Sequence, residues 1–288
     1  MLLTAEADQL VRQARNAAAR AATLARVQVV DEDGMERLRD IAGLFVAVWG
    51  TSPSGAPLPA DLLRSISHAG CNVTAAYSEG GVLCGAAVAI VSPDNSSMYS
   101  LIAGVLPDVA DVGVGFALKQ HQRAWAVARG LDTMTWTFDP LVSRNARFNL
   151  TKLGAHAAEY VQDFYGLMDD ELNANDESDR LVAVWPLTTP QTIACSDGLP
   201  MTVELPAFTA DDVRSTGPDG NPVLVETDGS LWCRVPGDIV SLRGVNPDEA
   251  TAWRACAREI FRAAFASGHT ARGVTRAGWY RLAPGGAL

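Results

Sequence analysis

The stretch "LPDVADVGVGFALKQHQ", residues 106–122, combines the end of a strand, a glycine turn and the start of a helix. Gly113 and Gly115 fall where the helix would begin, and the first turn of a helix has N–H groups without partners inside the helix. Glycine leaves such groups accessible because it has no side chain. The stretch therefore predicts a strand–turn–helix unit with a candidate phosphate site. Packing of a helix against a sheet is the alternative reason for these glycines.

Alternating and helical patterns continue on both sides of this turn. Strands are expected at 27–30, 72–78, 82–92, 96–107, 131–138, 158–168 and 179–187, and helices at 35–48, 60–69, 113–129 and 143–154. Asp33 and Glu36 have the spacing of a capping box, which predicts the start of the helix at 35–48. The order of elements predicts an α/β layer fold with a mixed sheet.

The composition changes after residue 187. Residues 188–222 are irregular and rich in turn-forming residues. A hairpin over 223–236, a helix beginning at Asn246-Pro247 and two final strands are expected after them. We therefore divide the chain into an Ala-rich N-terminal helix at 1–26, a main domain at 27–187 and a small C-terminal α/β subdomain at 188–288.

The charge and the cysteine pattern restrict the partners and the compartment. The chain of 288 residues has a net charge of −10, which argues against nucleic acid and anionic membranes as main partners. Its five cysteines form no CxxC pair and its four histidines are dispersed, so free thiols and no metal site are expected.

The N-terminus lacks the apolar segment of a secretory signal, and no apolar run is long enough to span a bilayer. A cytoplasmic location is expected.

Longer motifs resemble a known family. "AGVLPDVADVGVGFALK" (103–119) and the stretch 132–166 resemble the pyrophosphate-binding turn, the following strand and the "KLGA" turn of the GNAT superfamily of acyl-CoA-dependent N-acyltransferases. "WTFDPLVSRNARFNLTKLGA" (136–155), "SDRLVAVW" (178–185) and "WRACAREIF" (253–261) resemble motifs of a poorly characterised bacterial GNAT-like group. The resemblance covers the chain from about residue 27 onward. It implies a GNAT-like, mostly antiparallel mixed sheet flanked by helices.

The resemblance also implies a cofactor and its contacts. Acetyl-CoA or another acyl-CoA would be the co-substrate, with its pyrophosphate at the turn and its pantetheine arm along the preceding strand. The residues implied in binding are Gly104, Val105, Val112, Gly113, Val114, Gly115, Phe116 and Asn145. Asn145 has helix capping as its alternative role.

The turn departs from the family pattern. Ala110 stands at the Arg/Gln position of the signature, and Asp111 and Val112 follow where Gly and Arg are expected. Loss of one or two charge-assisted hydrogen bonds would weaken CoA binding by roughly 10- to 1,000-fold. Lys119, one turn into the helix, is a candidate to compensate. The sequence thus predicts a weakened phosphate site.

The catalytic pattern departs as well. Leu150 stands where many GNAT enzymes have a tyrosine that protonates the CoA thiolate. Asp139, at the end of a strand, is the candidate general base, with an Asp-Pro turn or a helix cap as the alternative. Tyr160 and Tyr165 are the nearest remaining hydroxyls, and Tyr165 is taken as a catalytic candidate.

The C-terminal helix carries two arginines one turn apart, Arg254 and Arg258. They either bind a substrate carboxylate or form structural salt bridges with Glu259 or Asp248. The loop at 169–178 is acidic, and solvation alone is expected to explain it.

The predicted function is transfer of an acetyl or acyl group from CoA to an amine of a small molecule, by direct attack, with no nucleic-acid or membrane partner. Two alternatives stay open: a repurposed GNAT fold that binds a small molecule or a protein, and other acyl-CoA chemistry such as decarboxylation. A homodimer and a monomer are both compatible with the sequence.

Overall fold

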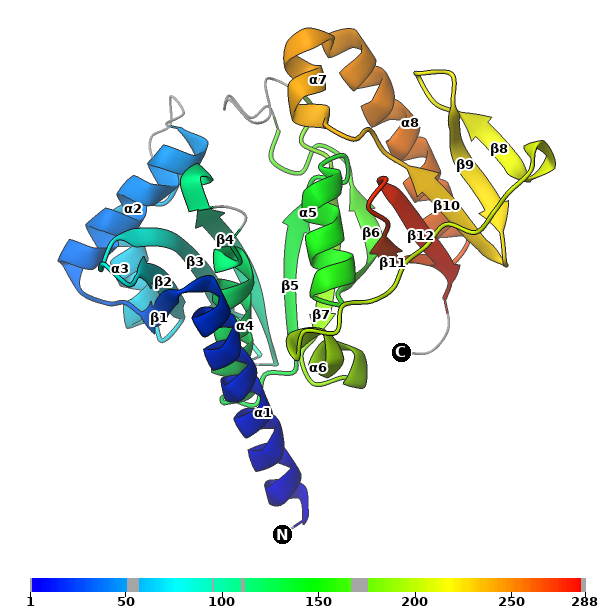
Figure 1. Ribbon diagram of the computed structural model, residues 1–288. Coiled ribbons are helices and arrows are strands. Elements are labelled where there is room, and N and C mark those ends of the chain that lie inside the picture. Colours follow the sequence, from blue (N-terminus) through cyan, green and yellow to red (C-terminus); the bar gives the residue numbers. More distant parts are fainter. Residues whose placement is uncertain (1, 51–56, 95, 110–111, 167–175, 286–288) are drawn as a thin grey trace. The chain divides into compact units, whose positions relative to one another are not determined.

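The computed structural model describes residues 2–50, 57–94, 96–109, 112–166 and 176–285 (Figure 1). It contains two compact units. Unit 1 comprises Met1–Trp136 and Pro186–Asp197, and unit 2 comprises Thr137–Trp185 and Gly198–Leu288. The division into 1–26, 27–187 and 188–288 follows composition rather than packing, and it stays a prediction.

Unit 1 is built on five strands. They are β1 (Val27–Asp31), β2 (Asn72–Ser78), β3 (Leu83–Val91), β4 (Ser97–Val105) and β5 (Thr133–Phe138), and the chain passes into unit 2 within β5. The strands lie in the order β1-β2-β3-β4-β5. The pairs β1–β2, β2–β3 and β3–β4 are antiparallel, whereas the pair β4–β5 is parallel. All five strands were predicted, as was the hairpin of β2 and β3.

Helices cover both faces of these strands (Figure 1). Unit 1 contains α1 (Leu2–Ala25), α2 (Met35–Trp49), α3 (Ala60–His68), the 3-10 turn η1 (Pro107–Val109), α4 (Val114–Val127) and α6 (Pro190–Ser196). Ala86 and Val88 of β3 belong to the core under α2 and α3, whereas Ala87 belongs to the core under α4. This alternation places the two cores on opposite faces of the sheet.

The alanines of the N-terminal helix have a packing role. Ala14, Ala17, Ala21 and Ala25 are buried at helical spacing, and α1 packs along α4 (Figure 1). Their small side chains let the two helix backbones approach closely.

Unit 2 contains a second antiparallel arrangement. Its helices are α5 (Ser143–Arg147), the π-helix η2 (Phe148–Lys152), the 3-10 turn η3 (Ala210–Asp212), α7 (Ile239–Val245) and α8 (Pro247–Ala266). Its strands are β6 (His156–Val161), β7 (Arg180–Pro186), β8 (Val213–Thr216), β9 (Pro222–Thr227), β10 (Ser230–Arg234), β11 (His269–Val274) and β12 (Trp279–Pro284). They lie in the order β7-β6-β11-β12-β10-β9-β8, and each pair is antiparallel.

The fold class is confirmed, because the sheet pairings are mixed but mostly antiparallel and helices flank them. Among the described residues, no helix combines the length and the apolar character needed to cross a bilayer. Among the elements of the described residues, α6, α7, β8 and the two 3-10 turns η1 and η3 were missed. Thr189 and Pro190 are a recognisable start signal for α6, since the Thr189 side chain accepts a hydrogen bond from the Thr192 N–H and Pro190 opens the helix.

Two local expectations need correction. The capping box at Asp33 is absent: α2 has Gly34 at its N-cap, with no side-chain hydrogen bond. The helix expected over 143–154 is divided into α5 and a π-helical turn. The Thr151 hydroxyl of that turn exchanges hydrogen bonds with the backbone of Val274, which ties the turn to β11.

Candidate functional site

Strand β4 has an open edge in unit 1. It pairs with β5 only from Ser97 to Tyr99, although β4 continues to Val105. Its other edge pairs with β3 along its whole length. From Ser100 onward, no strand among the described residues pairs with the edge of β4 that faces β5. Backbone N–H and C=O groups along such an edge are available to an extended ligand.

A β-bulge lies at the start of this open edge. Ala89 of β3 is opposite Ser100 and Val88 is opposite Ile102, so Leu101 is the extra residue of β4. A bulge leaves its extra residue outside the regular ladder and bends the strand. Sequence patterns gave no signal for this bulge, because it is visible only in the register of two strands.

After β4 the chain forms the 3-10 turn η1, and α4 begins at Val114, close to the predicted start. Gly113 is the N-cap of α4 and has φ +99°, a conformation that side chains disfavour. Gly115 has no such conformation, and a Cβ there would lie 3.7 Å from Val105 Cγ2, an ordinary contact. Packing therefore does not require a glycine at 115. Ala110 and Asp111 lie outside the described residues.

Gly104 is explained by packing. A Cβ at this position would lie 2.7 Å from two ring atoms of Trp49, at the end of α2. The ring thus occupies the space that a side chain at 104 would need. The Trp49 ring therefore covers one face of β4 at the end of the strand. Val105, the next residue in the chain, lies against Gly115.

Lys119 is buried and does not extend from the turn. Only 5% of it is exposed, and its Nζ donates a 2.7 Å hydrogen bond to Ser100 Oγ. The same Nζ lies 4.2 Å from the centre of the Trp136 ring. Burial lowers the pKa of Lys119 to about 7. The expectation that Lys119 compensates for the missing arginine at the turn is therefore not supported by its position.

In unit 2, Asp139 is the centre of a buried charge cluster. Arg254 contacts both of its carboxylate oxygens, at 2.8 and 2.9 Å, and Arg243 Nη2 lies 2.6 Å from Oδ2. The N–H of Leu141 donates to Oδ1. Burial alone would raise the pKa of Asp139, but the hydrogen bonds and charges of Arg254 and Arg243 outweigh it and hold the pKa well below its usual range. This geometry argues against a general-base role and agrees with the turn alternative.

The acidic loop and the C-terminal helix complete this cluster. Asp176 accepts hydrogen bonds from Arg243 and Arg254, at 3.0 and 2.8 Å. Arg258 pairs with Asp179 and with Glu177. Arg254 and Arg258 thus form structural ion pairs, but with partners other than Glu259 and Asp248. The described end of the acidic loop has more than a solvating role.

The two candidate hydroxyls differ in their surroundings. The Tyr160 hydroxyl donates a 2.5 Å hydrogen bond to Asp179 Oδ2, and burial together with this carboxylate raises the pKa of Tyr160 well above its usual value. Tyr165 is 49% exposed, and its hydroxyl lies 3.1 Å from Thr137 Oγ1. The Arg180 guanidinium lies 5.4 Å from the centre of the Tyr165 ring. Tyr165 is therefore the more accessible proton donor.

The remaining predicted residues of unit 2 lie on α5 and on the π-helix η2 that follows it. Asn145 is exposed on α5, where its Oδ1 is 3.4 Å from Asn149 Nδ2. Leu150 is fully buried. The structure thus brings Gly104, Val105 and the residues 112–116 together in unit 1, whereas Asp139, Asn145 and Tyr165 belong to unit 2.

Replacing Lys119 by methionine should change how stability depends on pH. A lysine in the unfolded chain has a pKa of 10.5, so above about pH 7 the unfolded state holds one more proton than the folded state. The free energy of unfolding of the wild type should therefore rise with pH between about 7 and 9, by up to about 1.4 kcal/mol per pH unit, and Lys119→Met should lose this rise. Urea denaturation at several pH values measures it. Parallel curves for the two proteins would contradict the lowered pKa.

Asp139→Asn should destabilise the protein strongly. It removes a carboxylate charge from between buried arginines, and breaking such a cluster costs about 3–5 kcal/mol. Guanidinium denaturation measures the effect. Asp211→Asn, at an exposed carboxyl of the same unit, is the matched control and should change stability by less than about 0.5 kcal/mol. Equal stability of the two variants would show that the cluster contributes nothing.

Comparisons with known proteins bear on unit 1 most directly. Residues 9–141 match the family model described as an acetyltransferase (GNAT) domain. No curated protein matches the chain. Among the described residues, no group of three or more metal-binding side chains comes together.

Several solved structures are similar at low identity. The ribosomal-protein-S18-alanine N-acetyltransferase from Escherichia coli is 16% identical with a TM-score of 0.44, covering 57% of this chain and 95% of its own. A phosphinothricin acetyltransferase from Sinorhizobium meliloti, solved with AcCoA, is 16% identical with a TM-score of 0.46, covering 56% and 88%. An N-acetyltransferase from Staphylococcus aureus Mu50 is 14% identical with a TM-score of 0.46, covering 56% and 98%.

The matched residues 9–141 contain β1–β5 and α4, with the open strand edge and the glycine turn that follows it. Residues 9–141 of this chain thus match the acetyltransferase (GNAT) domain family.

Proposed function

We propose that this protein transfers an acetyl or other acyl group from CoA to an amine of a small molecule in the cytoplasm. The observation that carries the proposal is the open edge of β4, which ends in a glycine turn at the start of α4. The extended thioester arm of an acyl-CoA needs an open strand edge, and its pyrophosphate needs a helix start that follows this edge.

The pantetheine arm is proposed to bind along β4. Its amides can form hydrogen bonds with strand backbone groups between Ser100 and Val105, as an added strand would. The Trp49 ring fills the space that a side chain at Gly104 would need, so one face of the strand end is already occupied. The bulge at Leu101 offers a backbone N–H outside the ladder, and such a group can polarise a thioester carbonyl.

The pyrophosphate is proposed to bind at the start of α4. The helix dipole and the backbone N–H groups of residues 112–116 provide the attraction, and the missing side chain of Gly115 permits close approach. Val112 is exposed and apolar, so this turn lacks the arginine that would add a charge-assisted bond. We therefore expect weaker CoA binding than the full family signature would give.

The chemical step is proposed to be direct attack. The amine nitrogen attacks the thioester carbonyl carbon, the C–S bond breaks, and the thiolate takes a proton. Tyr165 is proposed as the donor because the residue is 49% exposed and its hydroxyl is paired with the neutral hydroxyl of Thr137, at 3.1 Å. Asp139 is proposed to act indirectly, by holding Arg243 and Arg254, because a carboxylate engaged by two guanidinium groups is a weak base.

Gly115→Ala should weaken acetyl-CoA binding by about tenfold, because its methyl group obstructs the phosphate while its backbone conformation is allowed. Isothermal titration calorimetry measures the affinity. Gly43→Ala, in open space on α2, is the matched control and should leave affinity unchanged.

The double substitution Ala110→Arg and Asp111→Gly should tighten acetyl-CoA binding, since it restores the family signature at the turn. Unchanged affinity in both turn variants would contradict a pyrophosphate site at this turn.

Tyr165→Phe should lower kcat by about 10- to 100-fold and leave the KM for acetyl-CoA unchanged, because it removes a proton donor and no cofactor contact. Thiol release with a panel of primary amines measures the rate. Thr137→Val, which removes only the hydroxyl partner, should have a smaller effect in the same direction. If Tyr165→Phe retains the full rate, another group protonates the thiolate. Acetyl-CoA binding without transfer to any amine would favour the repurposed fold or other acyl-CoA chemistry.

A further inference from the structure

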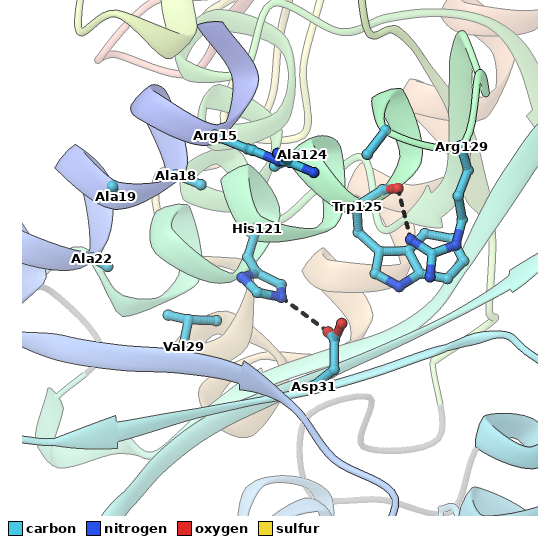
Figure 2. A pocket seen from close by; sticks show the side chains of 11 residues that line it. Arg15, Ala18, Ala19, Ala22, Val29, Asp31, His121, Ala124, Trp125 and Arg129 are labelled. Atoms are coloured by element: carbon cyan, nitrogen blue, oxygen red, sulfur yellow. Dashed lines mark hydrogen bonds and ion pairs between the residues drawn. The ribbon is translucent and has the colours of Figure 1, made fainter. Parts of the chain in front are cut away.

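A groove lies on the opposite end of α4 from the glycine turn. It is formed by α1, the C-terminal half of α4 and β1, all within unit 1, and it has a volume of about 360 Å³ (Figure 2). Its walls are largely the alanines of α1 and α4, and its polar residues are Arg15, Asp31, His121 and Arg129. The size is that of a site for a small molecule.

Only one of the two carboxylate oxygens of Asp31 accepts hydrogen bonds from the described residues. Its Oδ1 accepts hydrogen bonds from His121 Nε2 at 2.9 Å, Asn72 Nδ2 at 2.9 Å and Thr74 Oγ1 at 3.1 Å. Its Oδ2 accepts none from the described residues. Burial alone would raise the pKa of Asp31. His121 and the two other donors lower it by more, so the net pKa is lowered and the carboxyl group is ionised at neutral pH. Figure 2 shows the His121 ring directed at one of the two carboxylate oxygens.

Two guanidinium groups line the same groove without a carboxylate partner. Arg129 lies over the Trp125 ring at 3.6 Å and donates to the backbone oxygen of Trp125, which orients the guanidinium. Arg15 comes from α1 and points along α4 toward Ala124 (Figure 2). Within the described ranges, no Asp or Glu oxygen lies at ion-pair distance from either arginine. In a chain with a net charge of −10, this groove thus holds two positive charges that have no carboxylate partner among the described residues.

The geometry points to a binding site for a small zwitterion, an α-amino acid with an apolar side chain. The ammonium group would bind Asp31 Oδ2, and the carboxylate would bind Arg15 and Arg129. The apolar side chain would lie against the alanine walls. A simple anion would leave Asp31 Oδ2 without a donor, and a simple cation would leave both arginines without a carboxylate.

This site is separate from the proposed acyl-CoA machinery. The groove begins at His121, whereas the phosphate turn ends at the first turn of α4. None of the residues that line the groove belongs to the open edge of β4 or to the turn. The proposal therefore does not depend on acyl transfer.

Calorimetric titration of the full chain with L-leucine is the first test, and we expect a dissociation constant in the micromolar to low millimolar range. L-Leucinamide lacks the carboxylate and 4-methylpentanoate lacks the amine, so each should bind at least tenfold more weakly. No binding of L-leucine, L-methionine or L-phenylalanine at 10 mM would overturn the proposal. Equal binding of L-leucine and either analogue would overturn the zwitterion assignment.

Variants locate the binding. Arg15→Gln and Arg129→Gln should each weaken L-leucine binding by about tenfold or more and leave acetyl-CoA binding unchanged. Arg12→Gln, at an exposed arginine of α1 outside the groove, is the matched control and should have no effect. If L-leucine binds the two groove variants as tightly as the wild type, it occupies another site, such as that of the acyl acceptor, and the groove proposal fails.

Discussion

The pairing of β4 with β5 ends after Tyr99, and the proposed acyl-CoA site of unit 1 depends on this limit. A strand that kept pairing along its whole length would offer no backbone group to a ligand. Because the pairing stops, β4 continues to Val105 with one open edge and leads into the turn and α4. Lys119 lies against the first residues beyond the pairing, since it contacts Ser100 of β4 and Trp136 of β5.

The two buried charge systems follow different physical rules. Asp139 is surrounded by arginines and is held ionised, because hydrogen bonds and opposite charge outweigh the cost of burial. Lys119 has a hydroxyl and an aromatic ring as partners but no carboxylate among the described residues, so burial lowers its pKa. The first arrangement stabilises unit 2 and reduces the basicity of Asp139. The second holds an amine with a pKa near neutral pH beside the open strand edge.

Local patterns predicted elements well and partners poorly. The hairpin of β2 and β3, the turn at Gly113 and the helix from Pro247 follow from alternation, glycine and capping signals that lie within a few residues. Arg254 and Arg258 were recognised as a pair, but their partners Asp139, Asp176 and Asp179 are about 80 to 115 residues away in sequence. Short-range spacing contains no information on such distances. The bulge at Leu101 was missed for the same reason, because it depends on the register with β3.

The sequence by itself determined the mixed fold, the strand–turn–helix unit and the GNAT resemblance, since each rests on residues that are close along the chain. Only the tertiary structure decided which polar groups are exposed and which are engaged. It buried Lys119, surrounded Asp139 with arginines and left the Tyr165 hydroxyl accessible. It also placed Arg15, Asp31 and Arg129 around one groove. The physical reason is that charge, burial and hydrogen bonding depend on neighbours in space, which packing alone brings together.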